Sequence, residues 1–372
     1  MIQFTRLMDT LPVTVPFVGP EALERLRGNP FRARIGANEN VFGPSPKAIE
    51  AMQKAVFEGW QYGDPENHDL RHSIADFYNI RPANVMVGEG IDGLLGYLVR
   101  MVVEPDEKVV TSLGAYPTFN YHVVGFGGEL ITVPYVDDRE DPQALVEMAR
   151  KVKPKLVYLA NPDNPMGTWN SGKEISEMLD SLPQETLLVL DEAYIEFAPA
   201  DAEMALDIDD PRLVRFRTFS KAYGMAGMRV GYALGEEKLI SAFNRVRNHF
   251  GMCRVSQVGA LISLSDQENL RLVIGRVEEA RERIKVIAEN NGLKTLNSGA
   301  NFVAVDGGRD GDFARILLSE LVKRDIFVRM PLASPQDRCI RISAGTTSNL
   351  DYLEEVFPSA LANSIKIYAE KS

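Results

Sequence analysis

Residues 217–232 have the sequence RTFSKAYGMAGMRVGY, in which Lys221 lies between a strand-like run, Leu213 to Phe219, and a turn rich in glycine. Ser220 precedes the lysine directly, and Arg229 follows it. A lysine amine can hold an aldehyde covalently once its pKa is lowered. Hydroxyl and guanidinium groups bind phosphate. The stretch therefore predicts a site for pyridoxal 5'-phosphate (PLP), an aldehyde cofactor that carries a phosphate.

The bulk properties of the chain limit the kinds of partner that it can have. Its 372 residues are enough for a large core and for two domains. The formal net charge of −11 argues against nucleic acid as the main partner. Cys253 and Cys339 lie in no metal-ligand spacing, so we expect no metal site and a reducing, cytoplasmic setting. No signal peptide and no run of about 18 apolar residues is present, so no membrane span is predicted.

Short β-rich runs alternate with helical ones over the first two thirds of the chain. Several of the runs are apolar throughout, as expected for strands that are covered on both faces. This alternation predicts an α/β fold whose large domain has a mainly parallel central sheet. The predicted strands are Asn84–Val87, Lys108–Ser112, Leu130–Pro134, Lys155–Ala160, Thr186–Leu190, Leu213–Phe219 and Arg229–Leu234.

The ends of the chain have different patterns. Residues 1–46 are predicted to form an N-terminal arm, extended from about residue 11 and packed on a small domain, and residues 47–260 to form the large PLP-binding domain. Residues 261–372 are predicted to form a smaller α+β domain, because a long amphipathic helix leads to a different pattern of elements. That domain is expected to contain the helix through Leu270 to Ile287, a helix near Asp312–Lys323, and strands at Asn301–Val305, Ile326–Arg329 and Cys339–Ser343.

Asp191 ends an apolar strand, which is where ligands bind in open α/β sheets. A carboxylate there would favour a protonated ring nitrogen, and a protonated pyridine accepts electrons from a substrate carbanion. Tyr194, three residues later, could hydrogen-bond the phenolic oxygen of the ring. Taken alone, an aspartate at such a position is more often a loop residue that caps a turn.

Two turns could supply further cofactor contacts. Asn164 lies in the turn Asn161–Thr168 after a predicted strand, and its amide could donate to the phenolic oxygen. The turn Gly88–Gly93 joins a strand to a helix, so its backbone N–H groups could bind the phosphate. Each turn could also be only a connection.

Three more side chains are candidates for the site. Phe119 could stack on the planar ring, although a lone aromatic side chain more often packs in the core. Arg341 lies in an apolar strand, where a bidentate grip on a substrate carboxylate or a buried ion pair would offset the cost of burial. Arg329 is a second such case and could meet an anionic side chain of the substrate.

Five segments together resemble the fold type I PLP enzymes, and among them the histidinol-phosphate aminotransferases most. The resemblance covers residues 37–345. Its segments are similar to the family patterns NENPxGPSP, YPDP…LR, NPNNPTGT, DEAYIEF and SKAFGLAGLR. In this chain they are Asn38–Pro46, Tyr62–Pro65 with Leu70-Arg71, Asn161–Thr168, Asp191–Phe197, and Ser220–Gly224 with Gly227–Arg229.

The resemblance implies a role for each matching residue. Lys221 would carry the cofactor and move protons, Asp191 would pair with the pyridine nitrogen, and Tyr194 and Asn164 would hold the phenolic oxygen. Tyr62 would reach the cofactor phosphate of the neighbouring subunit, so the active unit would be a homodimer. Phe119 would stack on the ring where the family usually has Tyr. The remaining implied contacts are those of the phosphate, by Ser220, Arg229 and the backbone of Ile91 and Asp92, other cofactor contacts, by Gly90 and Thr218, and those of the substrate, by Arg341, Arg329 and Asn40.

The chain departs from the family pattern at three positions. Ile91 and Gly93 stand in a turn that usually has the pattern GxGSDE, so a hydroxyl and a carboxylate are missing. Phe17 stands near a position where relatives often have a Tyr-Pro-Gly element that helps to bind substrate. These differences bear on the choice of substrate more than on PLP binding.

The leading hypothesis is an aminotransferase that moves an amino group from a donor to 2-oxoglutarate by a ping-pong mechanism. Histidinol phosphate is the first candidate donor, and an aromatic or other amino acid is the next. A PLP lyase similar to threonine-phosphate decarboxylase is an alternative on the same scaffold. A PLP-binding regulator without turnover is a third reading, against which the acidic charge and the lack of an appended DNA-binding segment argue.

Overall fold

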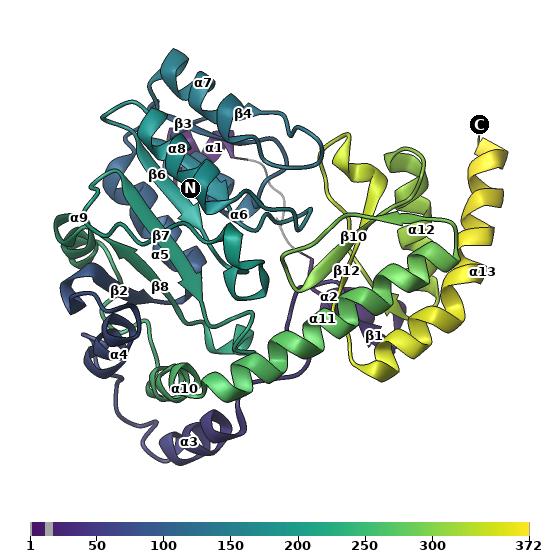
Figure 1. Ribbon diagram of the computed structural model, residues 1–372, viewed down its shortest axis with the longest axis horizontal. Helices are drawn as coiled ribbons and strands as arrows, with labels where there is room; N and C mark the ends of the chain where they lie inside the picture. The colour runs from purple at the N-terminus through teal and green to yellow at the C-terminus, as the bar shows by residue number, and fades with distance from the viewer. Residues whose placement is uncertain (1, 12–17, 372) are drawn as a thin grey trace.

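The computed structural model describes residues 2–11 and 18–371, which form a large α/β part and a smaller α+β part (Figure 1). The large part is built on a seven-stranded sheet. In the order in which they pair, its strands are β2 (Val85–Gly88), β8 (Gly231–Gly235), β7 (Leu213–Thr218), β6 (Leu187–Asp191), β5 (Leu156–Ala160), β3 (Lys108–Ser112) and β4 (Glu129–Val133).

The sheet is mainly parallel, as the sequence predicted. Strands β7, β6, β5, β3 and β4 run in one direction, and only β8 pairs antiparallel with its two neighbours, β2 and β7. Parallel strands all present their carboxyl ends at the same edge. The residues that follow β5, β6 and β7 are therefore brought together, although they are far apart in the sequence.

Helices cover both faces of this sheet, which explains why its central strands are apolar throughout. Helices α5 (Gly90–Val102) and α6 (Pro117–Gly125) pack in one buried cluster, and α7 (Pro142–Val152) and α8 (Gly172–Ser181) in another. The other helices of this part are α3 (Pro46–Val56), α4 (His68–Tyr78), α9 (Glu237–Ala242) and α10 (Arg254–Ser265).

The smaller part begins along α11 (Gln267–Asn290), which runs from one part to the other (Figure 1). Strands β9 (Lys294–Thr295), β10 (Phe302–Asp306) and β12 (Cys339–Ser343) form its antiparallel sheet, with α12 (Gly311–Lys323) and α13 (Thr347–Lys371). The predicted strand Ile326–Arg329 is shorter than expected. It is β11 (Ile326–Phe327), which pairs with the N-terminal arm instead of this sheet.

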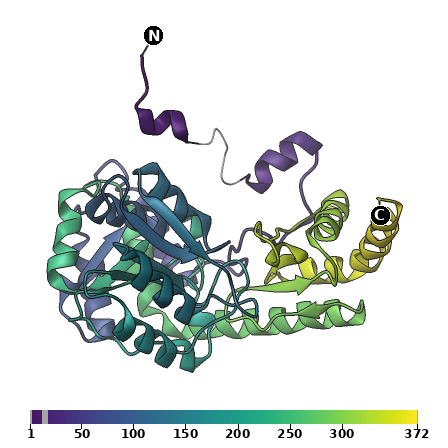
Figure 2. The ribbon, with the colours of Figure 1, turned by 90° about the horizontal axis from the view of Figure 1, so that it is seen from above.

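The arm is not extended throughout, so that prediction is wrong for residues 20–27. They form α2 (Pro20–Arg27), with proline at the first helical turn and Gly28 in the left-handed conformation at the C-cap. The arm then enters β1 (Ala33–Arg34), which is parallel to β11. Helix α1 (Arg6–Thr10) buries none of its residues and stands apart from the body in Figure 2.

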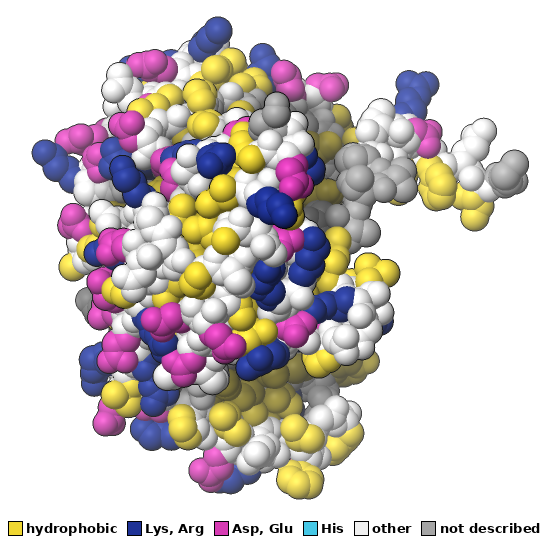
Figure 3. Space-filling view, turned by 90° about the vertical axis from the view of Figure 1, so that its right-hand side faces the viewer, with side chains coloured by type: hydrophobic (Ala, Val, Ile, Leu, Met, Phe, Trp, Pro, Cys, Tyr) yellow, Lys and Arg dark blue, Asp and Glu magenta, His cyan; other side chains and the backbone are white. Residues whose placement is uncertain are grey.

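The surface carries charges of both signs. On the face shown in Figure 3, Lys and Arg side chains alternate with Asp and Glu, without a large patch of one sign. Within residues 2–11 and 18–371, no helix combines the length and the apolar character needed to cross a membrane.

A buried ion cluster lies directly beside the end of β6. Glu192 accepts hydrogen bonds from Arg215 at 2.7 and 2.9 Å and from Arg217 at 2.9 Å. Burial alone would raise the pKa of Glu192, but the charges of Arg217 and Arg215 outweigh it and hold the pKa below its ordinary value. The cluster joins β6 to β7, and these strands carry the residues Asp191 and Thr218 of the cavity described below.

We expect Glu192→Ala to lower the free energy of unfolding by about 3–5 kcal/mol, because it leaves two buried guanidinium groups without their shared carboxylate. Chemical denaturation of the purified variant measures the loss. Glu177→Ala is the matched control, since Glu177 pairs with Lys173 on the surface at 3.6 Å, and it should leave the midpoint unchanged. Equal midpoints for both variants would contradict the expectation.

Candidate active site

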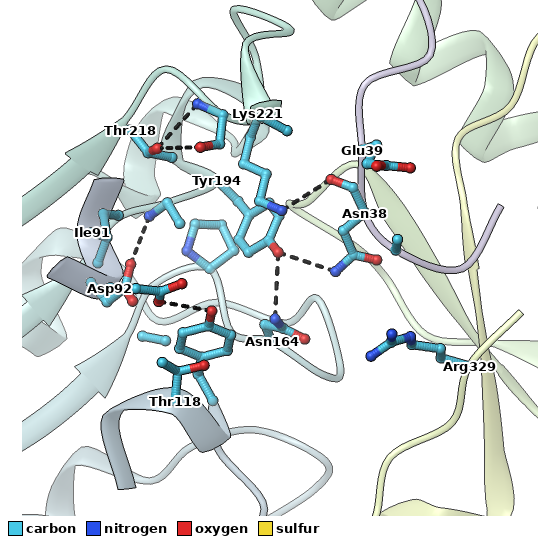
Figure 4. A pocket seen from close by; sticks show the side chains of 18 of the residues that line it. Asn38, Glu39, Ile91, Asp92, Thr118, Asn164, Tyr194, Thr218, Lys221 and Arg329 are labelled. Atoms are coloured by element: carbon cyan, nitrogen blue, oxygen red, sulfur yellow. Dashed lines mark hydrogen bonds between the residues drawn. The ribbon is translucent and has the colours of Figure 1, made fainter. Parts of the chain in front are cut away.

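A cavity of about 380 Å³ lies at the carboxyl edge of the large sheet, where the arm and the smaller part meet it (Figure 4). Its lining comes from most of the segments that carried a predicted site residue, but not from the segment around Tyr62. The lining includes Asn38 and Glu39 from the arm, Ile91 and Asp92 from α5, Asn164, Asp191 and Tyr194 after β5 and β6, Thr218, Ser220, Lys221 and Arg229 around the lysine turn, and Arg329 and Arg341 from the smaller part.

Asp191 lies at the floor of the cavity and is buried. Its Oδ2 accepts a hydrogen bond from the Tyr158 hydroxyl at 2.7 Å, and its Oδ1 accepts one from the backbone N–H of Ala193 at 3.0 Å. Burial raises the pKa of Asp191 to about 6, while the two hydrogen bonds oppose that rise. A cation placed beside Asp191 would therefore find a carboxylate already aligned and poorly solvated.

Tyr194 is at the centre of a hydrogen-bonded group that includes two asparagines. Its hydroxyl accepts from Asn38 Nδ2 at 3.1 Å and from Asn164 Nδ2 at 3.4 Å (Figure 4). The backbone oxygen of Asn38 also accepts from Lys221 Nζ at 3.1 Å. These four groups present amide, hydroxyl and amine hydrogens toward one region of the cavity, which suits an electron-rich oxygen.

Lys221 is held in place through its own backbone. The side-chain amide of Asn40 donates to the backbone oxygens of Lys221 and Ala222, at 3.0 and 3.1 Å. Gly224 has φ of 68°, and a Cβ on it would lie 2.3 Å from the backbone of Gly43. Glycine is therefore required for the lysine turn to pack against the arm.

The opposite end of the cavity has the donors of an anion site. Helix α5 begins there at Gly90, so its first backbone N–H groups have no partner within the helix. Arg229 Nη1 donates to Ser220 Oγ at 3.3 Å, and Thr218 Oγ1 donates to the same oxygen at 2.9 Å. A Cβ on Gly90 would lie 2.5 Å from Arg229 Nη2, so the glycine lets the guanidinium approach the helix end.

Two arginines line the cavity from the smaller part. The backbones of Arg329 and Arg341 are bridged, with N–H···O distances of 3.3 and 2.6 Å, which brings the two residues side by side. The Arg341 guanidinium donates to Asn164 Oδ1, and its Nε has no hydrogen-bond partner within the described ranges. Burial lowers the pKa of Arg341 to about 10, with Tyr194 opposing that shift and the like charge of Arg329 adding to it.

The structure corrects two of the predicted contacts. Phe119 is fully buried and stacks on Tyr158 with ring centroids 4.3 Å apart, so it does not face the cavity. Because α6 starts at Pro117, the residues that face the cavity from this turn are Tyr116 and Thr118. Asn40 is also not part of the lining, since its amide is used to hold the lysine turn.

Tyr62 lies outside the cavity of its own chain. Tyr62 is 76% exposed, and its ring packs on that of Phe250 with centroids 4.7 Å apart. Its predicted role toward a neighbouring subunit stays a prediction. Phe17 lies outside the described residues. Of the other two departures from the family pattern, Ile91 lines the cavity, whereas a Cβ on Gly93 would make only ordinary contacts, the nearest at 3.5 Å.

Several lining residues were not predicted. Tyr116 donates to Asp92 Oδ1 at 2.9 Å, and Tyr158 contacts Asp191. Asn38 and Glu39 lie in the same Asn-Glu-Asn run as Asn40, which was the only residue of that run predicted to bind the substrate. The run was therefore a usable signal, but the sequence alone does not show which of its three side chains faces the cavity.

Residues 34–357 match the family described as aminotransferase class I and II. The chain belongs to this family. The aminotransferase is 32% identical over 360 residues to Histidinol-phosphate aminotransferase 2 of Carboxydothermus hydrogenoformans, a match that covers 94% of this chain and 97% of the relative. The predicted family resemblance is confirmed.

Solved structures agree with this assignment. The aminotransferase superposes on the histidinol-phosphate aminotransferase from Sinorhizobium meliloti, solved in complex with PLP, with a TM-score of 0.95, 49% identity and 98% of each chain covered. Aspartate aminotransferase from Thermus thermophilus shares the fold, with a TM-score of 0.80 at 20% identity, over 97% of this chain and 100% of that one. The predicted fold class is confirmed.

Proposed function

We propose that this aminotransferase uses PLP, takes the amino group from histidinol phosphate and passes it to 2-oxoglutarate by a ping-pong mechanism. The observation that carries the proposal is the pair Arg329 and Arg341, side by side in the same cavity as Lys221. The names of the relatives from C. hydrogenoformans and S. meliloti support this choice of donor. We also propose that the protein is a cytoplasmic homodimer in which Tyr62 contacts the cofactor phosphate of the neighbouring subunit.

The residues present fit PLP at both ends. The phosphate would be held by Ser220, Thr218, Arg229 and the N-terminus of α5, where Gly90 leaves room for the guanidinium. The nitrogen of the ring would be held by Asp191, which Tyr158 fixes in place. When bound, PLP supplies an electron-poor ring that accepts the electrons released at the substrate α-carbon.

Each side chain then has a distinct task. Asp191, fixed by Tyr158 and a backbone N–H, keeps a proton on the ring nitrogen by ion pairing. Tyr194 and Asn164 donate toward the phenolic oxygen. The amine of Lys221 removes the proton from the substrate α-carbon and returns it to a different carbon, and its neighbours Asn38 and Tyr194 keep it over the cavity.

The charge of the two arginines favours a dianionic group on the donor. Their guanidiniums repel each other, and Asn164, a neutral amide, is the side chain that accepts from Arg341. A phosphate monoester brings nearly two negative charges and three acceptor oxygens, so it can satisfy both groups at once. A single carboxylate would leave part of that charge uncompensated.

The test is an amino-donor screen with the purified holoprotein and 2-oxoglutarate. Histidinol phosphate, phenylalanine, tyrosine and histidine are compared by kcat/KM and by the change in cofactor absorbance when the donor is added alone. Histidinol phosphate should have the largest kcat/KM. A preference for an amino acid would contradict the proposed donor, and release of carbon dioxide without any need for 2-oxoglutarate would instead favour the lyase.

Arg329→Met should raise KM for histidinol phosphate about 10- to 100-fold, because one charge-assisted contact to the phosphate is lost. The KM for phenylalanine should change much less. Steady-state kinetics with both donors measure the difference. Arg324→Met is a matched control, since Arg324 contacts Glu320 away from the cavity. An equal rise in KM for both donors would contradict the role.

A further inference from the structure

Two carboxylates of the cavity have no role above, and they differ in their surroundings. Of the described lining residues, Asp92, Asp191 and Glu39 are acidic. Asp92 accepts from the Tyr116 hydroxyl, and Asp191 accepts from Tyr158. In contrast, the Glu39 carboxylate accepts no hydrogen bond and forms no ion pair within residues 2–11 and 18–371.

The position of Glu39 is set by its neighbours. Asn38 and Asn40 are both buried, and their amides are bonded to Tyr194 and to the lysine turn. Asn301 also donates to the backbone oxygen of Glu39 at 3.3 Å. The backbone is therefore held on both sides, while the side chain of Glu39 is exposed to the cavity.

Glu39 lies on the same side of the cavity as Arg329, across from Ile91 and Asp92 (Figure 4). Its negative charge acts on Arg329, where it opposes the effect of burial on the pKa of that guanidinium. This wall of the cavity thus offers a cation and an anion to the same ligand.

We propose that Glu39 is a specificity-determining residue that accepts a hydrogen bond from a ring N–H of the amino donor, while the phosphate of that donor lies at Arg329 and Arg341. This inference rests on the proposed function. An imidazole ring can donate such a bond in its neutral and its protonated form. A phenyl ring has no hydrogen-bond donor and would desolvate the carboxylate without compensation. Such a site therefore discriminates strongly against a donor that has phenyl in place of imidazole.

The test compares two donors that differ only in the ring: histidinol phosphate and phenylalaninol phosphate. The proteins are the wild-type chain, Glu39→Ala and Glu39→Gln, with Glu129→Gln as control because Glu129 is exposed on the edge strand β4. Steady-state kinetics give KM and kcat, and titration of the cofactor absorbance gives an apparent dissociation constant for each donor.

Wild type and Glu129→Gln should prefer histidinol phosphate. In Glu39→Ala the ratio of kcat/KM for histidinol phosphate to that for phenylalaninol phosphate should fall about 10- to 100-fold. The fall should come from KM and the dissociation constant, with kcat changed little. Glu39→Gln keeps a neutral acceptor and should be intermediate. If Glu39→Ala weakens the binding of both donors equally, or of neither, Glu39 does not discriminate between the two rings. If the wild type turns over neither phosphate, the proposed function fails and this inference fails with it.

Discussion

Lys221→Ala should reduce the rate of transamination at least about 10³-fold, because it removes the group that moves the proton between donor and cofactor carbons. The effect should appear in kcat with every amino donor, since the lost step is common to all of them. The second readout is borohydride reduction of the holoprotein followed by peptide mapping. It should label Lys221 in the wild type and leave the variant unlabelled.

Lys238→Ala is the matched control for this variant. Lys238 lies on the surface helix α9 and is not part of the cavity lining, so its loss should change neither the rate nor the labelled peptide. Labelling of another lysine in the wild type, or a Lys221→Ala rate within a few-fold of the wild type, would overturn the assignment of the cavity.

Asp191→Asn should lower kcat about 10²- to 10³-fold. Asparagine is similar in size and can still accept from the Tyr158 hydroxyl, but it has no charge to keep a proton on the ring nitrogen. The absorbance of the bound cofactor and its rate of loss on dialysis report the ring environment separately from turnover. Both should change in this variant.

The control for Asp191→Asn is Tyr158→Phe, which keeps the charge and removes one hydrogen bond to it. Its kcat should fall far less than that of Asp191→Asn, because the ion pair remains. If the two variants lost equal activity, the shape of the site and not the charge of Asp191 would be the important feature.

Much of the fold could be predicted because the strands of the large sheet are short, apolar and separated by helical patterns. Asp191, Asn164 and Lys221 could be found for the same reason, since Asp191 ends one of these strands and the other two lie in the turns that follow two others. The prediction was poorer in the N-terminal arm, where the sequence has no clear helical or strand pattern. Residues 20–27 were expected to be extended because residues 11–46 are rich in Pro, Gly and Asn, yet Pro20 begins the helix α2 and Gly28 caps its end.

The errors within the site arise from side-chain direction. A turn that begins a helix presents successive residues on different sides, so Tyr116 and Thr118 face the cavity while Phe119 faces the sheet. The proximity of Arg329 and Arg341 depends on a bridge between segments that no local pattern specifies. Only the three-dimensional arrangement distinguishes such residues from their neighbours.

Residues 33–40 have a consequence for recombining this enzyme with its relatives. They pair with β11, Ile35 accepts from Ser343, and Asn38 accepts from both Lys221 and Asn301. A crossover placed between the large and small parts alone would exchange Arg329 and Arg341 but leave Asn38 and Glu39 behind. A functional chimera with a new donor preference therefore needs two crossovers, so that the N-terminal segment is inherited with the C-terminal part.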